Sequence, residues 1–254
     1  MIQPAPSLSV ASVEHHDPAI SIITVAYNDL ENLRGTLANL FALPHGSNLE
    51  FIVIDGGSKD GTREYLQGLS EPRLRWISEP DKGLYDAMNK GIERAEKPWL
   101  WFINAGDTVD AALLRPALTD SSQALIFVPV LDNGKFVRKR VPQWQIPYCH
   151  QGTLFRRDAS IRYDTRLKIG GDYKYMLQYL RTYKLHPRNV PIQRINGAVV
   201  AELNGISRQN RVARDIEACR ISLEHFGVCS NVLFFAALMI YQYSRRWLNR
   251  KRTA

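Results

Sequence analysis

The feature that most constrains this chain is an alternation of continuous apolar runs with segments of helical periodicity. The apolar runs occupy residues 21–27, 51–57, 74–80 and 98–104, and the helical patterns between them cover residues 29–41, 60–69 and 84–96. The repeat of roughly 25 residues has the length of a βαβ unit. Because the runs are apolar throughout, they predict strands buried on both faces, which means a parallel sheet with helices on each side.

Polar residues follow each of the four predicted strands. They are Tyr27-Asn28, Asp55 to Ser58, Glu79 to Lys82, and Asn104 to Asp107. Right-handed crossovers bring the carboxyl ends of parallel strands to one edge of the sheet. Ligands of open α/β sheets bind at that edge. We therefore expect a binding site there, and the alternative is a chance coincidence of four polar turns.

The second half of the chain changes character but shows no linker. The patterns predict a hairpin at 124–141 that turns at 132–134, a strand at 152–158, a helix at 172–184, a strand at 197–203 and helices near 208–226 and 230–250. We expect one catalytic domain over residues 20–228, with a nucleotide-binding half at 20–110 and an acceptor half at 111–228. Residues 1–19 are expected to form a flexible extension.

The net charge and the cysteine positions indicate the compartment in which the protein works. The formal net charge is +8, and five of the last ten residues are arginine or lysine. Cys149, Cys219 and Cys229 form no C-x-x-C pair, so neither a zinc site nor a disulfide framework is indicated. This favours a reducing cytoplasm.

Residues 229–254 predict an amphipathic helix with a basic end. The apolar part is too short to span a membrane of about 20 helical residues, so it suits a helix that lies in the interface and meets anionic lipid. The expected location is cytoplasmic, peripheral on the inner face of the cell membrane. The alternative is a helix docked on the domain with its basic end in water.

Several common catalytic and nucleotide-binding motifs do not occur. The sequence has no G-x-G-x-x-G, no Walker phosphate loop, no H-E-x-x-H and no G-x-S-x-G. What remains is a set of acidic residues beside glycines at strand ends. This set suits a ligand that carries a base, a ribose and a metal-bridged pyrophosphate.

Four stretches in this order resemble the N-terminal half of family 2 glycosyltransferases with the GT-A fold. They are SIITVAYNDLENL, FIVIDGGSKDGTREYL, SEPDKGLYDAMNKGI and FINAGD. Downstream, HQGTLFRRD, RYDTRLKIGGDYKYMLQYL and NGIS resemble the branch that includes the colanic acid and exopolysaccharide enzymes. The likeness spans residues 20 to about 226. It implies an α/β nucleotide-diphospho-sugar transferase fold, with a central mostly parallel sheet, flanking helices and C-terminal helices.

The resemblance implies a set of residues that bind the donor nucleotide. They are Tyr27, Asn28, Asp55, Gly57, Ser58, Lys82, Asp86, Asn89, Asn104, Ala105 and Gly106. Each also has a structural alternative. Asp55 could cap a turn, Lys82 could be a solvated lysine, and Asp86 with Asn89 could form a polar helix face. Asp60 is expected mainly to cap a helix, because aspartate is a favoured N-cap residue.

Asp107 is the predicted metal ligand. Family members carry an Asp-x-Asp-like motif at this point, whereas this chain reads Asn104-Ala-Gly-Asp107 and keeps one carboxylate. One aspartate suffices in principle for Mg²⁺ or Mn²⁺, because phosphate and water supply the other oxygens. The alternative is an aspartate that only forms the turn.

Asp172 matches the position of the catalytic base in inverting members of the family. A base takes the proton of the acceptor hydroxyl as the glycosidic bond forms. The two preceding glycines are expected to let the loop adapt around the acceptor, and helix capping is the alternative role. His150 and Gln151 are expected to face the cleft and contact acceptor or phosphate, and Ser207 is expected in a mobile loop over the donor, with Arg208 and Arg211 near phosphate.

These expectations combine into one function. The chain is expected to transfer a sugar from a UDP- or GDP-sugar to a hydroxyl of a lipid-linked oligosaccharide in surface polysaccharide synthesis, with inversion and with Mg²⁺ or Mn²⁺. Two alternatives stand beside it. A basic nucleic-acid-binding protein is compatible with a pI near 9.5, but no nucleic-acid-binding motif is visible. A nucleotidyltransferase would normally carry a glycine- and lysine-rich loop after the first strand, where Tyr27 to Leu30 stand here.

Overall fold

The computed structural model describes residues 19–44, 48–114, 124–132, 135–136, 149–186, 190, 198–201, 210, 213–214 and 216–225. Most of the predicted N-terminal extension, the predicted helix at 229–254, and Ser207, Arg208 and Arg211 lie outside these residues. No helix among the described residues is long and apolar enough to cross a membrane.

A six-stranded sheet forms the centre of the molecule, in the order β3-β2-β1-β4-β9-β6. Its first four members are β1 (Ile20–Ala26), β2 (Leu49–Asp55), β3 (Leu74–Ser78) and β4 (Trp99–Phe102), and they pair in parallel. β9 (Thr153–Arg156) runs antiparallel to both β4 and β6 (Leu125–Phe127). The mostly parallel sheet predicted from the apolar runs is therefore confirmed.

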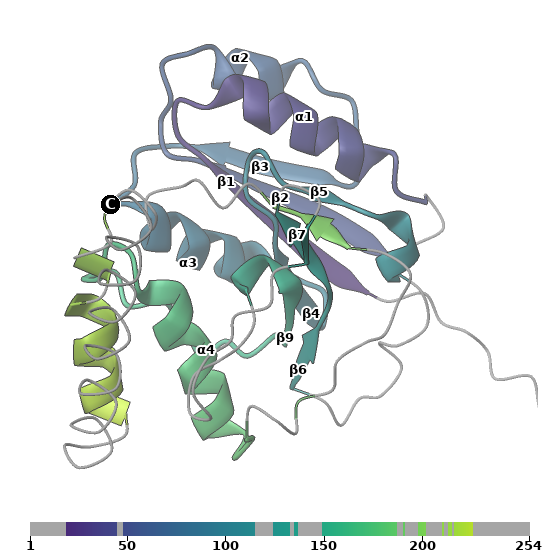
Figure 1. Ribbon diagram of the computed structural model, residues 1–254. Coiled ribbons are helices and arrows are strands. Elements are labelled where there is room, and N and C mark those ends of the chain that lie inside the picture. The colour runs from purple at the N-terminus through teal and green to yellow at the C-terminus, as the bar shows by residue number, and fades with distance from the viewer. Residues whose placement is uncertain are drawn as a thin grey trace, which may run out of the picture.

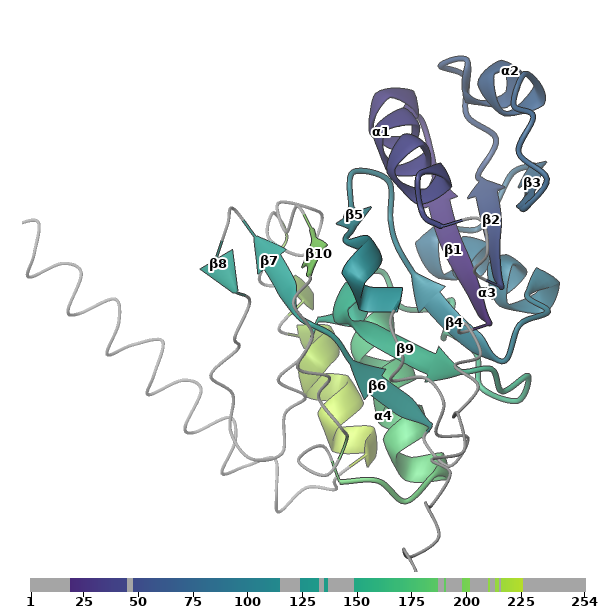
Figure 2. The same cartoon turned by 90° about the vertical axis from the view of Figure 1, so that its right-hand side faces the viewer.

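Helices cover both faces of this sheet (Figures 1 and 2). α1 (Leu30–Phe41) and α2 (Thr62–Gln67) lie on one face, and α3 (Leu84–Arg94) and α4 (Gly171–Thr182) lie on the other. Successive side chains of a strand point to opposite faces. Ile22 accordingly packs with Leu33 and Leu37 of α1, while Ile23 packs with Met88 of α3. This explains why apolar residues occupy both faces of the central strands.

β3 and β4 are shorter than the apolar runs that predict them. The run at 74–80 ends as a strand at Ser78, because Pro80 has no N–H for the ladder. The run at 98–104 ends at Phe102, and Asn104 enters a turn that closes on Asp107. The polar residues therefore stand in loops beyond the strands, which leaves their backbone free to shape the edge.

The prediction of one hairpin at 124–141 is wrong in its first strand. β6 belongs to the large sheet, whereas β7 (Val130–Asp132) belongs to a second sheet with the order β5-β10-β7-β8. The chain changes sheets at Pro129, which cannot donate a ladder hydrogen bond. β7 pairs antiparallel with β8 (Lys135–Phe136), as the predicted hairpin requires, and residues 133 and 134 of the predicted turn lie outside the described residues.

The second sheet is small and stands beside β4 and β9 (Figure 2). Its other strands are β5 (Thr108–Val109) and β10 (Val199–Val200), and short 3-10 helices occupy Ala111–Leu114 and His150–Gly152. β10 falls inside the predicted strand at 197–203. Residues 216–225 are helical and fall inside the predicted helix at 208–226.

Glu50 organises the edge of the sheet at the amino ends of the strands. Its carboxylate accepts hydrogen bonds from the Ser21 hydroxyl at 2.5 Å and from the Glu96 and Lys97 N–H groups at 2.6 and 3.2 Å. The Arg75 guanidinium lies 3.3 Å away. Burial raises the pKa of this carboxyl, but the hydrogen bonds and Arg75 outweigh burial and hold the pKa below its usual value.

Asp60 links the starts of the two helices on one face. Its Oδ2 accepts the N–H of Leu30, the first residue of α1, at 2.9 Å. Its Oδ1 accepts the hydroxyl and the N–H of Thr62, the first residue of α2, at 2.7 and 3.2 Å. The capping role predicted for Asp60 is confirmed, and it extends to a second helix.

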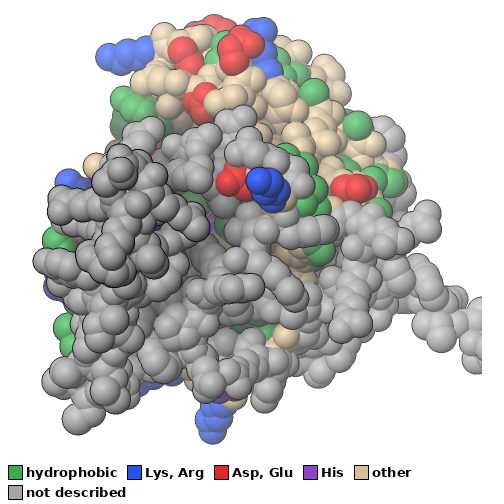
Figure 3. Space-filling model, viewed as in Figure 1, with side chains coloured by type: hydrophobic (Ala, Val, Ile, Leu, Met, Phe, Trp, Pro, Cys, Tyr) green, Lys and Arg blue, Asp and Glu red, His purple; other side chains and the backbone are tan. Residues whose placement is uncertain are grey.

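The outer surface over α1 and α2 carries acidic and basic side chains together (Figure 3).

Candidate active site

The loops after β1 and β2 are joined through Asn28. Its φ of 49° lies in the left-handed region, which asparagine adopts more readily than most residues. Its N–H donates to the Ser58 hydroxyl at 2.7 Å, and its Oδ1 accepts the Lys59 N–H at 2.8 Å. Tyr27, just before it, is 65% exposed. The edge therefore presents a rigidly placed loop with a free aromatic ring.

The side chain of Asp55 links the ends of β2 and β3 by hydrogen bonds. It is fully buried and accepts the hydroxyls of Ser58 and Ser78 at 2.5 and 2.6 Å. The Ser58 N–H adds longer bonds of 3.2 and 3.3 Å. The predicted turn-capping alternative is thus present in the structure. A base that contacts this carboxylate would have to displace one of the serine hydroxyls.

Two glycines allow neighbouring loops to approach Asp55 closely. A Cβ on Gly56 would lie 2.4 Å from Asp81 Oδ2, and Gly57 has a φ of 82° beside the backbone of Pro80. Asp81 itself accepts the Gly83 N–H at 2.8 Å. Sequence reasoning missed Asp81 as a site residue. Its place directly after the predicted strand at 74–80, among other polar residues, was the available signal.

Lys82 and Asp86 lie at the start of α3. Lys82 is exposed, and its N–H donates to Asp86 Oδ2 at 3.0 Å, so Asp86 ties the loop before α3 to the first turn of the helix. Asn89 lies one turn further along α3. Its amide exchanges two hydrogen bonds with the backbone of Tyr163, at 2.9 and 3.0 Å. The amide thus fastens α3 to the loop at Tyr163, and a contact of Asn89 with the donor stays a prediction.

The predicted metal-binding turn follows β4. Gly106 has a φ of 93°, and its N–H donates to the hydroxyl of Thr36 on α1 at 2.9 Å. That hydroxyl donates to the Asp107 carbonyl at 2.8 Å. Ala105 packs against the core cluster on the α1 side. The turn is thus held on α1, which fixes where its polar side chains stand.

Asp107 and Asn104 offer the oxygens that a divalent cation prefers. Asp107 Oδ2 accepts the Asn104 N–H at 3.0 Å, and the Asp107 side chain is largely buried. Asn104 Oδ1 is buried and has no hydrogen-bond partner within the described part of the chain. An orphaned amide oxygen next to a carboxylate fits a hard cation. Within the same residues no three His, Cys, Asp or Glu side chains gather, so phosphate and water would have to complete the shell.

Asp172 stands at the second residue of α4, against the first turn of α3. Its Oδ1 accepts the N–H of Tyr173 at 2.8 Å, and its side chain is half-buried. A Cβ on the preceding Gly171 would lie 2.6 Å from the ring of Tyr85. Burial raises the pKa of Tyr85, and the charge of Asp172 raises it further. α3 follows β3, so Asp172 lies on the carboxyl side of the sheet.

His150 does not face a cleft, which corrects the prediction. The side chain is buried and hydrogen-bonds through Nε2 to the Tyr163 hydroxyl. Burial lowers the pKa of the imidazole to about 3. Gln151 is also engaged, because its Oε1 accepts from the thiol of Cys149 at 2.6 Å and its carbonyl accepts the Trp101 indole N–H at 2.7 Å. Both residues support packing beneath β4.

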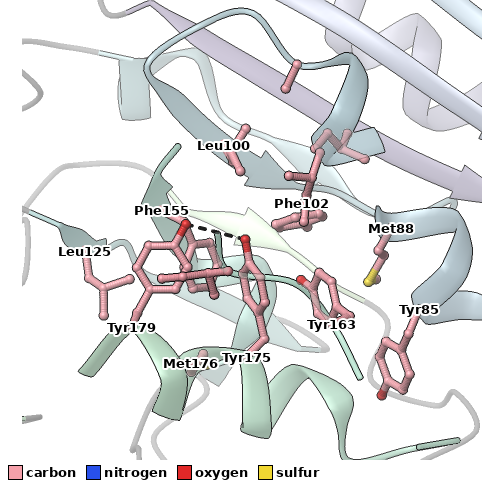
Figure 4. Packing of buried hydrophobic residues seen from close by; sticks show 14 of the residues in the cluster. Tyr85, Met88, Leu100, Phe102, Leu125, Phe155, Tyr163, Tyr175, Met176 and Tyr179 are labelled. Atoms are coloured by element: carbon pink, nitrogen blue, oxygen red, sulfur yellow. Dashed lines mark hydrogen bonds between the residues drawn. The ribbon is translucent and has the colours of Figure 1, made fainter. Parts of the chain in front are cut away.

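The rings of Phe102, Phe155 and Tyr163 surround His150. They belong to a cluster that reaches Tyr85 (Figure 4). Tyr163 stacks between Tyr85 and Tyr175, with ring centroids 5.5 and 4.0 Å apart. The hydroxyls of Tyr175 and Tyr179 lie 3.5 Å apart, as the dashed line marks. The cluster packs α4 on the sheet and so sets the position of the first turn of α4.

Comparisons with known proteins agree on one family. Residues 21–163 match the family model described as glycosyl transferase family 2. The chain is 44% identical over 90 residues to an uncharacterised glycosyltransferase of Mycobacterium tuberculosis, which covers 35% of this chain and 34% of that protein. It is 27% identical over 188 residues to the succinoglycan biosynthesis protein ExoO of Rhizobium meliloti, which covers 61% of this chain and 54% of that protein. The chain thus spans about a third to a half of these curated relatives.

A solved structure shows the same fold at low identity. The mannosyltransferase PcManGT from Pyrobaculum calidifontis, solved in complex with GDP-Man and Mn²⁺, aligns with a TM-score of 0.62. The alignment covers 91% of this chain and 83% of that one at 17% sequence identity. The architecture is therefore that of the GT-A enzymes.

Proposed function

Since this chain belongs to glycosyl transferase family 2, we propose that it moves a sugar from a UDP- or GDP-sugar to a hydroxyl of a lipid-linked saccharide. The relative named for succinoglycan biosynthesis supports a polysaccharide product. Family membership also favours a transferase over the two alternatives, a nucleic-acid-binding protein and a nucleotidyltransferase. We further propose that it works at the cytoplasmic face of the membrane, with residues 229–254 on anionic lipid.

The observation that carries the proposal is the meeting of two helix starts at the carboxyl edge of the sheet. The first turn of α4, with Asp172, packs on the first turn of α3 through Gly171 and Tyr85. α3 begins just after the loop that holds Asp81 and Lys82. A donor held over the loops of β1 and β2 would lie near a carboxylate on a separate element, as base catalysis requires.

The donor side would be formed by the loops of β1, β2 and β3. The exposed ring of Tyr27 offers a face to a nucleobase, beside Asn28, Gly57 and Ser58. The carboxylate of Asp55 lies beneath them and would accept from the base once a serine hydroxyl has moved. The exposed ammonium of Lys82 would offset the charge of the diphosphate.

Asp107 and Asn104 would hold a divalent cation through carboxylate and amide oxygens. A bound Mg²⁺ or Mn²⁺ supplies charge stabilisation for a departing diphosphate. This part of the proposal is supported by the unpartnered oxygen of Asn104. It is also supported by the Mn²⁺ in the solved mannosyltransferase complex.

Asp172 would act as the base in a single displacement. The acceptor oxygen forms a bond to the anomeric carbon while the bond from that carbon to the diphosphate oxygen breaks. The hydroxyl proton passes to the carboxylate of Asp172, and the electron pair leaves on the diphosphate. Attack from the side opposite the leaving group inverts the anomeric configuration.

The test is a donor screen combined with one substitution. Release of UDP or GDP is measured for a panel of UDP- and GDP-sugars with Mn²⁺, in the presence of bacterial membrane extract as the source of acceptor. Asp172→Asn keeps the shape of the side chain but cannot take a proton. It is expected to lower turnover by at least about 100-fold and to leave nucleotide binding unchanged. Near-normal turnover of Asp172→Asn would show that another group is the base.

A further inference from the structure

A half-buried carboxylate holds the segment that leads into Asp172. Glu217, from the helix at 216–225, accepts the N–H groups of three consecutive residues. Its Oε1 accepts from Lys168 at 3.0 Å, and its Oε2 accepts from Ile169 at 2.9 Å and from Gly170 at 2.7 Å. Asp172 follows two residues later. One carboxylate therefore fixes the backbone orientation of the loop that ends at the proposed base.

The same loop is held from its other side by Tyr85. The Tyr85 hydroxyl donates to the Ile169 carbonyl at 2.6 Å. Ile169 is thus fixed through both its N–H and its carbonyl, by side chains of two different helices. The loop has little freedom to move while both contacts persist.

The two glycines before Asp172 serve close approach, which corrects the expectation of an adaptable loop. A Cβ on Gly170 would lie 2.8 Å from Ile221 Cδ1, and a Cβ on Gly171 would lie 2.6 Å from the Tyr85 ring. Both glycines are buried, and neither has a positive φ. The loop is compressed between α3 and the helix at 216–225.

We infer that Glu217 is a positioning residue, which sets the place of the Asp172 carboxylate by binding the three N–H groups of residues 168–170. The inference rests on the proposed role of Asp172. Three charge-assisted hydrogen bonds on one short segment restrict both its position and its tilt. A displacement of about 1 Å at a reacting group costs on the order of 100-fold in rate.

The simpler alternative is that Glu217 only docks the helix at 216–225. That helix has a second and independent anchor, because Glu224 accepts from Lys174 Nζ of α4 at 2.9 Å. Lys174 also pairs with Asp164. Glu224→Gln weakens the docking of the helix and leaves the loop at 168–170 untouched. It is therefore the matched control for Glu217→Gln.

The first measurement needs no substrate. Hydrogen–deuterium exchange of the full chain is followed in peptides that cover residues 164–175. Glu217→Gln offers one acceptor oxygen and one N–H₂ donor, so it cannot accept from all three N–H groups. Exchange at residues 168–170 is expected to be faster in Glu217→Gln than in the wild type and in Glu224→Gln.

The second measurement separates turnover from binding. With the best donor of the UDP- and GDP-sugar panel, Glu217→Gln is expected to lower kcat by about 10- to 100-fold. The KM for that donor, and the Kd for free UDP or GDP, should stay within about twofold because no donor contact changes. In the Asp172→Asn background the same substitution should add no further loss, since both act through one group.

The outcomes distinguish the inference from the proposed function. If Asp172→Asn abolishes turnover while folded Glu217→Gln keeps the wild-type kcat, the inference is overturned and the proposed function stands. If Glu224→Gln lowers kcat as much as Glu217→Gln, docking alone explains the effect and the inference is also overturned. Normal turnover of Asp172→Asn defeats the proposed base itself. Should Glu217→Gln not fold, Glu217→Asp is measured instead, and an unchanged kcat there contradicts the inference.

Discussion

At the scale of single residues, the turn after β4 combines one carboxylate with one amide oxygen. Asp107 accepts a backbone N–H, whereas the side-chain oxygen of Asn104 has no hydrogen-bond partner within the described residues. An unpaired buried oxygen is costly, and a cation would satisfy it. This makes the response to metal the sharpest test of the turn.

Removal of divalent metal with EDTA is expected to abolish most of the turnover, and added Mn²⁺ should restore it. Asp107→Asn loses the anionic ligand, so the Mn²⁺ concentration for half-maximal activity should rise by at least about 10-fold. Asn104→Asp adds a carboxylate and should lower that concentration. A titration of activity against Mn²⁺ measures both. An unchanged Mn²⁺ requirement in Asp107→Asn would remove this turn from the metal site.

The sequence identified which residues surround the edge of the sheet but not what each side chain contacts. Asn28, Asp55, Ser58 and Asp107 were found because strand ends of a parallel sheet must meet. The contacts of Asn89 and His150 were not predicted, because the residues that bind or bury them are distant in the chain. Tyr163, for example, is 74 positions from Asn89. Such partners follow from tertiary packing and leave no local pattern.

At the scale of elements, the helix starts depend on side chains outside the helices. Asp29 and Gly61 stand at the N-caps of α1 and α2, and neither makes a side-chain cap bond. Asp60 supplies the side-chain acceptor at the start of both helices. The sequence predicted that Asp60 caps the nearer helix, α2. It did not predict the hydrogen bond from Leu30 to Asp60, because that bond depends on how the loops before α1 and α2 pack together.

Asp60→Ala is expected to destabilise the fold by about 1–2 kcal/mol, because two helix starts lose their acceptor at once. Urea unfolding of the purified protein, followed by circular dichroism, measures the change. Glu64→Ala is the control, since Glu64 is an exposed residue of the same helix. Equal stability of the two variants would mean that the capping contacts contribute nothing.

Element boundaries were predicted well where periodicity and length agreed, as for α1 and α3. They failed where a short apolar run could serve two sheets. Residues 125–132 are mostly apolar, but Pro129 divides them between β6 and β7. A proline in such a run signals a break, whereas the sheet that the next strand joins is decided by packing.

At the scale of the whole molecule, acid should destabilise the protein in two steps. The folded state keeps His150 neutral, because burial lowers its pKa from 6.5 to about 3. The unfolded chain binds a proton there below pH 6.5, so stability falls as the pH drops through that value. The slope for one proton is about 1.4 kcal/mol per pH unit.

The second step comes from carboxyls whose pKa is lower in the folded state. Hydrogen bonds and ion pairs lower the pKa of Glu50, Asp164 and Glu217, against the opposing effect of burial. Their contribution is present above the ordinary values of 4.5 and 3.8 and is lost as the pH falls below them. Urea unfolding between pH 7 and about pH 2 measures both steps.

The first step should become smaller in His150→Asn, which has no side chain that titrates there, and the remainder comes from His225, whose pKa is also lowered by burial. The exposed residue His186 provides the control, and His186→Asn should keep the wild-type slope. A slope between pH 6.5 and 5 that is the same in all three proteins would contradict the assignment to His150.

The Glu50 cluster lies at the amino ends of the strands, whereas the proposed chemistry lies at their carboxyl ends. The two ends of the strands therefore serve different purposes. The amino ends stabilise the fold, and the carboxyl ends carry the proposed chemistry. Residues around Glu50 could be varied for heat tolerance, and residues at the carboxyl ends could be varied for a new sugar. The two libraries could be screened separately and the best variants then combined.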